Sequence, residues 1–391
     1  MTIKPAFYAL VSLCLIFSIS SGCKQNKSQK ETEVLIQEPT EFTSGNLMDA
    51  SLDPSLIQQM EQAIAAGEYP NIHSVLILKD QKLVYENYFE GEDEIWGEKL
   101  GKTVHHSDSL HDVRSVSKSV VATCVGIAIK QGKIKDVNQK IFAFFPEYKE
   151  YDTGKRSQLT IKHLLNMSSG MEWNENVPYD NPENSEIQMT SSEDPIAFVL
   201  SRAIITEPGE AWEYNGGTTQ LLSAIIEKVS GSNIHEFAKQ YLFKPLGINR
   251  SEWTNFPGTE LPAAASGLRL RSRDMMKLGL LYANNGKWDN RQILTEAWVQ
   301  EATQAHIRFG RNNVGYGYQF WILPGDSFRE GQTHEIAAAF GNGGQRIYID
   351  YIHHIVVVVT AGNYNQWTIE KDSESLLIDF VYPAIMLPEP S

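Results

Sequence analysis

Ser115 and Lys118 stand at the start of the apolar segment "DVRSVSKSVVATCVGIAIKQG", residues 112–132. If this segment is a helix, residues three apart share one face, with their Cβ atoms about 5–6 Å apart. A serine beside a lysine can be a nucleophile with its own base, because an amine in apolar surroundings has a lowered pKa and accepts the serine proton. Ser21 and Lys24 have the same spacing, but the signal cleavage predicted below would separate them. The spacing therefore predicts acyl transfer through Ser115.

The position of Ser115 in the predicted helix adds to this chemistry. A helix N-terminus presents unpaired N–H groups and the positive end of the helix dipole, which suits an oxyanion forming beside the serine. The alternative is an ordinary amphipathic helix, whose serines cap its N-terminus and whose lysine extends to water. A Ser-x-x-Lys motif is common by chance, so the motif by itself does not separate the two.

The elements that must position this pair follow from hydrophobic periodicity. "PSLIQQMEQAIAAGEY" predicts a first helix that stops at Gly67, and "HSVLILKDQKLVYENYFEG" predicts a hairpin around the turn "KDQK". Residues from about 111 to 305 are mainly helical in pattern, with Ser272 and Thr295 as expected N-caps and Gly231 and Gly286 as expected stops. The β pattern returns after about residue 313, and "DSESLLIDFVYPAIM" predicts a final helix.

This order predicts an α+β fold. The economical arrangement is one antiparallel sheet built from both chain ends and flanked by the terminal helices, with the helical block inserted as a second lobe. We assign residues 53–110 and 306–391 to the α/β lobe and residues 111–305 to the helical lobe. The cleft between the lobes is the expected site of chemistry.

Residues 1–22 are expected to be a signal peptide. Lys4 is followed by "AFYALVSLCLIFSIS", which is too short to span a bilayer comfortably, and then by "SGC". This arrangement resembles a bacterial lipoprotein signal, in which Cys23 becomes the lipidated first residue, although Ser20 stands where such signals prefer leucine. An ordinary secretory signal cleaved nearby is the alternative, and both predict export. The polar residues 23–52 are expected to tether the domain, residues 53–391, to the membrane.

Composition and motifs argue against several other classes. A formal net charge of -14 leaves no basic patch for nucleic acid. With three cysteines, of which Cys124 is expected to be a small buried hydrophobe, no disulfide framework or cysteine metal site is predicted. The zincin-like "HEIAA" lacks its second histidine, and no G-x-S-x-G or phosphate loop occurs. The pairs His105–His106 and His353–His354 could bind metal, but adjacent strand residues point to opposite faces, so we interpret them as surface histidines and predict no metal site.

Five segments, in order along the chain, resemble the serine β-lactamase and penicillin-binding protein family, specifically its class C-like branch of esterases and amide hydrolases. The resemblance extends over about residues 56–390, and the five segments read "SLHDVRSVSKSVVATCVGIAIKQGKI", "LTIKHLLNMSSGMEW", "EPGEAWEYNGGTTQLLSAIIEKVSG", "ASGLRLRSRDMMKLGLLYANNGKW" and "FGNGGQRIYIDYIHHIVVVVTAGN". At the end of the second segment and two residues beyond it, "SSGMEWNE" resembles the 6-aminohexanoate-dimer hydrolases closely, and its Glu172 and Trp173 are expected either to line the cleft or to pack the loop. The resemblance implies a β-lactamase-like fold.

The resemblance also implies roles for residues outside the first helix. Tyr214 matches the family tyrosine that acts beside the Ser–Lys pair as a base or proton shuttle; the alternative is a core tyrosine. The family's Y-x-N pattern is not complete, because Gly216 stands in place of its asparagine and Asn215 comes one residue early, as an imperfect substitute in substrate binding.

In "AAFGNGG", residues 338–344, Ala339, Phe340 and Gly341 fall where the family has K-T-G or H-x-G. The glycine allows close approach of substrate, and the N–H of about Asn342 is the expected second oxyanion donor beside that of Ser115. The alternative is a glycine-rich turn entering a strand. The missing Lys or His, which in β-lactamases and D-Ala-D-Ala peptidases helps bind the substrate carboxylate, favours an esterase or amide hydrolase.

The sequence therefore predicts an exported, lipid-anchored serine hydrolase that cleaves a small ester or amide through an acyl-enzyme on Ser115, with Lys118 and Tyr214 moving the proton. It faces the periplasm or the cell surface and needs no cofactor. The alternatives are β-lactamase or D-Ala-D-Ala peptidase activity, or a catalytically silent sensor on the same fold. Oligomeric state and substrate identity are left open.

Overall fold

The computed structural model describes residues 41–386. The predicted signal peptide, Cys23 and most of the predicted tether lie outside the described residues. Within the described part, no helix is both long and apolar enough to cross a bilayer. Residues 42–52, which we assigned to the tether, pack on the domain instead. Leu52 is fully buried there, and the N–H of Gly45 donates to the carbonyl of Leu83 over 2.9 Å.

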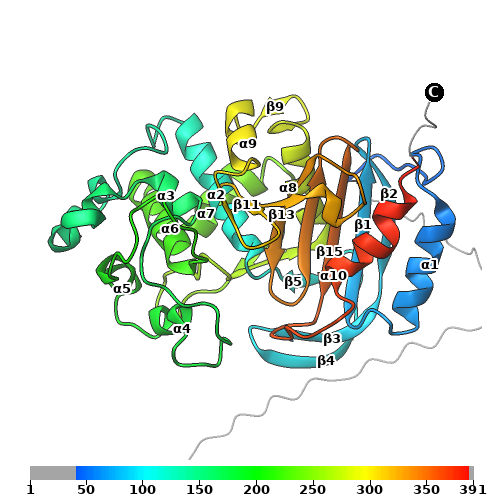
Figure 1. The fold of residues 1–391 in the computed structure, drawn as a ribbon, viewed down its shortest axis with the longest axis horizontal. Coiled ribbons are helices and arrows are strands. Elements are labelled where there is room, and N and C mark those ends of the chain that lie inside the picture. Colours follow the sequence, from blue (N-terminus) through cyan, green and yellow to red (C-terminus); the bar gives the residue numbers. More distant parts are fainter. Residues whose placement is uncertain (1–40, 387–391) are drawn as a thin grey trace, which may run out of the picture. The chain divides into compact units, whose positions relative to one another are not determined.

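Eight antiparallel strands form one sheet built from both ends of the domain, which confirms the predicted α+β class (Figure 1). The N-terminal hairpin joins the C-terminal strands because β1 pairs with β15. The turn of this hairpin is the predicted "KDQK", where Asp80 and Gln81 both have positive φ. In spatial order the strands are β10 (Ile307–Phe309), β11 (Val314–Tyr316), β12 (Trp321–Pro324), β13 (Glu335–Gly341), β14 (Gln345–Asp350), β15 (Ile355–Ala361), β1 (Ile72–Lys79) and β2 (Lys82–Tyr88).

Helices from the two chain ends cover one face of the sheet (Figure 1). The first helix, α1 (Pro54–Ala65), is capped by Asp53, whose side chain accepts from the N–H of Ser55. It packs against the C-terminal segment formed by α10 (Ser373–Leu376), a π-helical turn (Leu377–Val381) and α11 (Tyr382–Ala384). Ile57 and Met60 of α1 and Val357 of β15 share one apolar core. Terminal helices flanking the sheet are thus confirmed.

The opposite face is covered by α2 (Val116–Lys130) and α8 (Ser272–Ala283). The structure corrects the lobe boundary here, because we assigned α8 to the helical lobe and it packs on β1, β14 and β15. Its periodicity predicts an apolar face but not which surface that face covers. The expected N-cap is also shifted: Arg271 occupies the cap position and Ser272 is the first helical residue.

The remaining helices form the second lobe, on the far side of α2 from the sheet (Figure 1). α6 ends at Gly231 in the left-handed conformation and Thr295 caps α9, both as predicted. These helices are α3 (Ile161–Leu165), α4 (Ser185–Thr190), α5 (Pro195–Ser201), α6 (Gly216–Ser230) and α7 (Ile234–Ala238), while α9 (Glu296–Ala302) follows the short hairpin of β8 (Lys287–Trp288) and β9 (Arg291–Gln292).

A charged hairpin, β3 (Glu90–Ile95) and β4 (Glu98–Val104), was not predicted. Its sequence lacks apolar alternation, and cross-strand pairs of opposite charge such as Glu92 with Lys102 hold it instead. It leads to β5 (Leu110–Asp112), which pairs with β7 (Leu268–Arg271), and β7 pairs with β6 (Glu252–Trp253). Because β5 ends three residues before Ser115, this small sheet places the start of α2.

Candidate active site

Ser115 and Lys118 lie together at the N-terminus of α2, as their spacing predicts. Ser115 is the N-cap residue, and the Nζ atom of Lys118 donates to its Oγ atom over 2.9 Å. Lys118 also donates to the carbonyl oxygen of Ala265 over 3.0 Å and is 1% exposed. The lysine therefore does not extend to water, and this excludes the alternative of an ordinary amphipathic helix with an exposed lysine.

The backbone just before the nucleophile is strained. Arg114 has φ 48°, a left-handed conformation that costs a non-glycine residue about 1–2 kcal/mol. Its guanidinium is held by Glu94 of β3 over 2.6 Å and lies 5.1 Å from the ring centre of Trp96. The charged hairpin thus holds the turn that presents Ser115 to the cleft.

Tyr214 reaches the pair from the loop before α6. The Nζ atom of Lys118 lies 4.9 Å from the centre of the Tyr214 ring. Burial raises the pKa of the Tyr214 phenol, while the charge of Lys118 and hydrogen bonds with Ser115 and Lys118 act in the opposite direction. The structure therefore brings the three predicted catalytic residues together in one group.

The surroundings of Lys118 are acidic, not apolar as we expected. Burial by itself lowers the pKa of Lys118, but Tyr214, Glu186 and Glu175 raise it more, so this pKa lies above its ordinary value. The expectation of a lowered pKa was wrong because these acidic groups come from segments distant in sequence. The resting lysine is an ammonium group, and the Lys118–Tyr214 pair must lose a proton before it can accept the one from Ser115.

Glu175 and Glu186 form an acidic pair beside Lys118, and sequence reasoning missed both. Burial and the neighbouring Glu186 raise the pKa of Glu175 well above its usual range. For Glu186, burial acts to raise the pKa, but Lys118 and hydrogen bonds from Glu175 and Ser266 lower it further, so the net shift is downward. The two pKa values shift in opposite directions because two close carboxylates do not readily ionise together.

Backbone and side-chain donors fix this pair in place. Glu175 Oε2 accepts from the indole N–H of Trp173 over 2.6 Å and from the N–H of Gly216 over 2.5 Å. Glu186 Oε1 accepts from the hydroxyl of Ser266 over 2.9 Å. The exposed Glu172 instead pairs with Arg202. Of the two residues that were expected either to line the cleft or to pack the loop, Trp173 therefore supports the site and Glu172 does not.

The position of the Glu186 carboxyl group explains why residue 216 is a glycine. A Cβ atom at position 216 would lie 3.2 Å from Glu186 Oε2 and 3.3 Å from Ala265 Cβ, so Glu186 occupies the space into which a side chain at 216 would point. Asn215 is not brought into the cleft. It is 1% exposed, and its carboxamide oxygen accepts from the N–H of Thr218 as the N-cap of α6.

The end of β13 lies against the turn before α2. A Cβ atom on Gly341 would come within 2.2 Å of the carbonyl oxygen of Val113, so only glycine allows this approach. Asn342 follows, and its carboxamide is paired with Asn365 through two hydrogen bonds of 2.6 and 2.8 Å. Among the described residues, the backbone N–H groups of Ser115 and Asn342 donate to no other backbone group, as oxyanion donors require.

Two cavities of about 370 Å³ each have Ser115 and Asn342 in their walls. One is also lined by Glu186 and Phe256, and the other by Tyr214 and Gly341. The second contains a cation that sequence reasoning did not place. Arg346 of β14 lies opposite Phe340 in the register, 4.4 Å from its ring centre, and donates to the Gly341 carbonyl over 2.8 Å.

We expect Glu186→Gln to change the pH dependence of catalysis. Glu186 raises the pKa of Lys118, so loss of its charge lowers that pKa. The rate rises with pH as the Lys118–Tyr214 pair loses its proton, and this rising limb should move about one pH unit toward acid in the variant. The measurement is kcat/KM of ester hydrolysis against pH. Glu183→Gln, at an exposed neighbouring position, should not move the rising limb of the pH profile. If the limb does not move in Glu186→Gln either, Glu186 does not raise the pKa of Lys118.

Comparison with known proteins identifies the family of the chain. The family model described as Beta-lactamase matches residues 57–373. The chain is 25% identical over 265 residues to the 6-aminohexanoate-dimer hydrolase of Paenarthrobacter ureafaciens, covering 62% of this chain and 64% of that protein. The chain thus spans slightly less than two thirds of the length of this curated relative.

Solved structures show the same fold. A family VIII carboxylesterase superposes with a TM-score of 0.65 at 15% identity, covering 87% of this chain and 99% of the other. EstCE1, described as a hydrolase with promiscuous acyltransferase activity, superposes with a TM-score of 0.66 at 17% identity, covering 87% and 100%. At these identities the likeness shows the fold, and it confirms the β-lactamase-like architecture predicted from the five segments.

Proposed function

Because the chain belongs to the Beta-lactamase family, we propose that it is a serine hydrolase that cleaves a small ester or amide through an acyl-enzyme on Ser115. The observation that carries the proposal is the 2.9 Å contact between Lys118 Nζ and Ser115 Oγ, at the wall of two cavities. The hydrolase names of the relatives support it.

The first half-reaction forms the acyl-enzyme. The Lys118–Tyr214 pair, after losing one proton, takes the hydroxyl proton of Ser115 as its Oγ atom attacks the carbonyl carbon. The N–H groups of Ser115 and Asn342 stabilise the oxyanion of the tetrahedral intermediate. When this intermediate collapses, the pair returns the proton to the departing alcohol or amine.

The second half-reaction reverses these roles. Water gives a proton to the same pair and attacks the acyl carbon, and Ser115 Oγ leaves and regains its proton. Glu186, held ionised by Lys118 and Ser266, stabilises the ammonium form of Lys118 whenever the pair has accepted a proton. The proposal needs no metal or cofactor at this site.

A β-lactamase or D-Ala-D-Ala peptidase activity is the second candidate, and Arg346 favours it. Its guanidinium lines the cavity with Phe340 and Gly341, where it can meet a substrate carboxylate although no Lys or His precedes Gly341. Hydrolysis of nitrocefin well above the rate of simple esters, lost in Arg346→Gln, would favour this candidate over the esterase.

We also propose that the protein is exported and membrane-anchored through Cys23. The support is the signal-like sequence of residues 1–22 followed by "SGC". Mass analysis of the protein from a bacterial host, with Cys23→Ala as control, should find a lipid-modified N-terminal Cys23. Cleavage of the signal peptide without attachment of lipid would favour the alternative, an ordinary secretory signal.

The experiment that tests the hydrolase proposal is peptide-level mass analysis of the full chain, purified in detergent and treated with a fluorophosphonate. An activated serine forms a covalent adduct at Oγ with loss of fluoride. We expect the adduct on the peptide that contains Ser115 and no adduct there in Ser115→Ala. A folded protein without adduct would favour the catalytically silent sensor on the same fold.

A further inference from the structure

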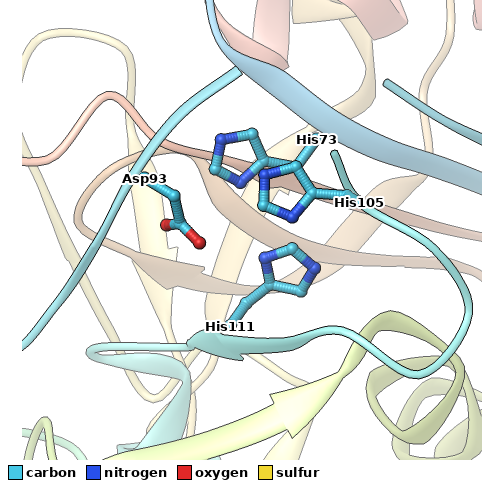
Figure 2. A group of neighbouring side chains, drawn as sticks. All are labelled: His73, Asp93, His105 and His111. Atoms are coloured by element: carbon cyan, nitrogen blue, oxygen red, sulfur yellow. The ribbon is translucent and has the colours of Figure 1, made fainter. Parts of the chain in front are cut away.

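Three histidines and an aspartate gather in the interior of the described domain (Figure 2). His73 lies on β1, Asp93 on β3, His105 directly after β4 and His111 on β5. All four are buried, and one ligand-capable atom from each lies within 4.8 Å of the others. This corrects the sequence interpretation of His105 as a surface residue: it is 4% exposed, while the adjacent His106 is exposed.

The hydrogen bonds of these imidazoles leave at least one nitrogen free on each ring. His73 Nε2 is 3.0 Å from the Glu92 carbonyl oxygen, and His111 Nε2 is 3.4 Å from the Thr360 hydroxyl. The Nδ1 atoms of both residues, and both ring nitrogens of His105, are buried without a partner in the described part of the chain. An unsatisfied buried polar atom costs about 1–3 kcal/mol, so four in one cluster require an explanation.

Metal ligation by histidine has this pattern, with one ring nitrogen held by a carbonyl or hydroxyl and the other directed at the ion. Asp93 adds a carboxylate oxygen and a negative charge. Nitrogen and oxygen donors in this number suit a tetrahedral Zn²⁺ ion.

A second group of histidines differs from the first in its hydrogen bonds. His334 Nε2 and His353 Nδ1 both lie within 3.0 Å of the Asp350 carboxylate, which already pairs with them. None of its ring nitrogens is a buried atom without a partner among the described residues. That group is complete as a hydrogen-bonded network, and it needs no ion.

We propose that His73, Asp93, His105 and His111 bind one structural zinc ion. The ligands are Nδ1 of His73, Nδ1 of His111, one ring nitrogen of His105 and a carboxylate oxygen of Asp93. The rings of His73 and His105 are stacked at 3.8 Å between centres, and two rings bound to one ion point their edges at it. Binding therefore turns the His105 ring, which no hydrogen bond restrains among the described contacts.

The ion would join the charged hairpin to the main sheet and to β5. Asp93 is followed by Glu94, which holds Arg114 in its strained conformation, and His111 lies four residues before Ser115. The role assigned to the ion is structural, because its four ligands leave no open position for substrate and none of them lines the catalytic cavities. It would hold in place the turn that presents the nucleophile.

The test uses the full chain, purified in detergent without a histidine tag or chelator, and metal analysis by mass spectrometry. We expect about one Zn²⁺ per chain after incubation with Zn²⁺ and desalting. His105→Ala and His111→Ala should lose it, while His106→Ala and His353→Ala keep it, because one is exposed and the other belongs to the second group.

Two further measurements keep the proposal testable if a variant fails to fold. Titration of the metal-free wild type with Co²⁺ should give the intense visible bands of a tetrahedral site, and Zn²⁺ in 100-fold excess over its Kd should raise Tm by about 4 °C. The proposal is overturned if the wild type retains no zinc and its Tm does not respond, or if His105→Ala retains zinc like the wild type. In either case the cluster is only a buried packing of neutral imidazoles.

Discussion

Replacing Ser115 with alanine is expected to lower kcat for ester hydrolysis by about 10⁶-fold, the largest effect of any single change in this chain. The variant lacks the Oγ atom that forms the acyl-enzyme, while Lys118 keeps its second acceptor, the Ala265 carbonyl, at 3.0 Å. Folding should therefore be little affected. The measurement is steady-state hydrolysis of a chromogenic ester, with Tm recorded for both proteins.

Ser119→Ala is the matched control for this loss. Ser119 lies one turn further along α2, is also buried, and donates to the Gln319 carbonyl over 2.6 Å. It should keep activity within about tenfold, since it only loses a structural hydrogen bond. If Ser115→Ala retains more than a trace of turnover, Ser115 is not the nucleophile.

Replacing Lys118 with methionine is expected to lower kcat by about 10³–10⁴-fold, because the pair that moves the serine proton loses its cation. Glu186, whose ionised form Lys118 stabilises, then keeps a buried charge without that compensation, so Tm should fall as well. The double variant Lys118→Met with Glu186→Gln removes both charges. It should recover Tm but not activity, which separates the chemical role of Lys118 from its structural one.

A double variant tests whether Lys118 and Tyr214 act as one unit in proton transfer. Tyr214→Phe combined with Lys118→Met should cost little more than Lys118→Met alone, because residues that act as a unit are not additive. Lys130→Met, at the other end of α2, is the control and should leave kcat unchanged. Activity of Lys118→Met within tenfold of the wild type would contradict the mechanism.

Much of the fold was predictable from the sequence because its signals are local. Period 3.6 predicts α1 and α6, and period 2 with turn residues such as Asp80 and Gln81 predicts the N-terminal hairpin. The charged hairpin β3–β4 was missed, because charge pairing between strands leaves no periodic apolar signal. The placement of α8 on the sheet was missed for another reason: an apolar helix face does not encode which surface it will cover.

The sequence by itself determined the Ser115–Lys118 contact, since helix geometry fixes the distance between residues three apart. Only the tertiary structure decided the electrostatics of that contact. Glu175 and Glu186 lie in a long loop and a short helix without any spacing rule that relates them to Lys118, yet they help to raise its pKa. The same holds for His73, His105 and His111, whose shared interior position results from strand pairing across the fold. Local backbone geometry depends on neighbouring residues in the sequence, whereas the surroundings of a buried charge depend on every segment that folding brings to it.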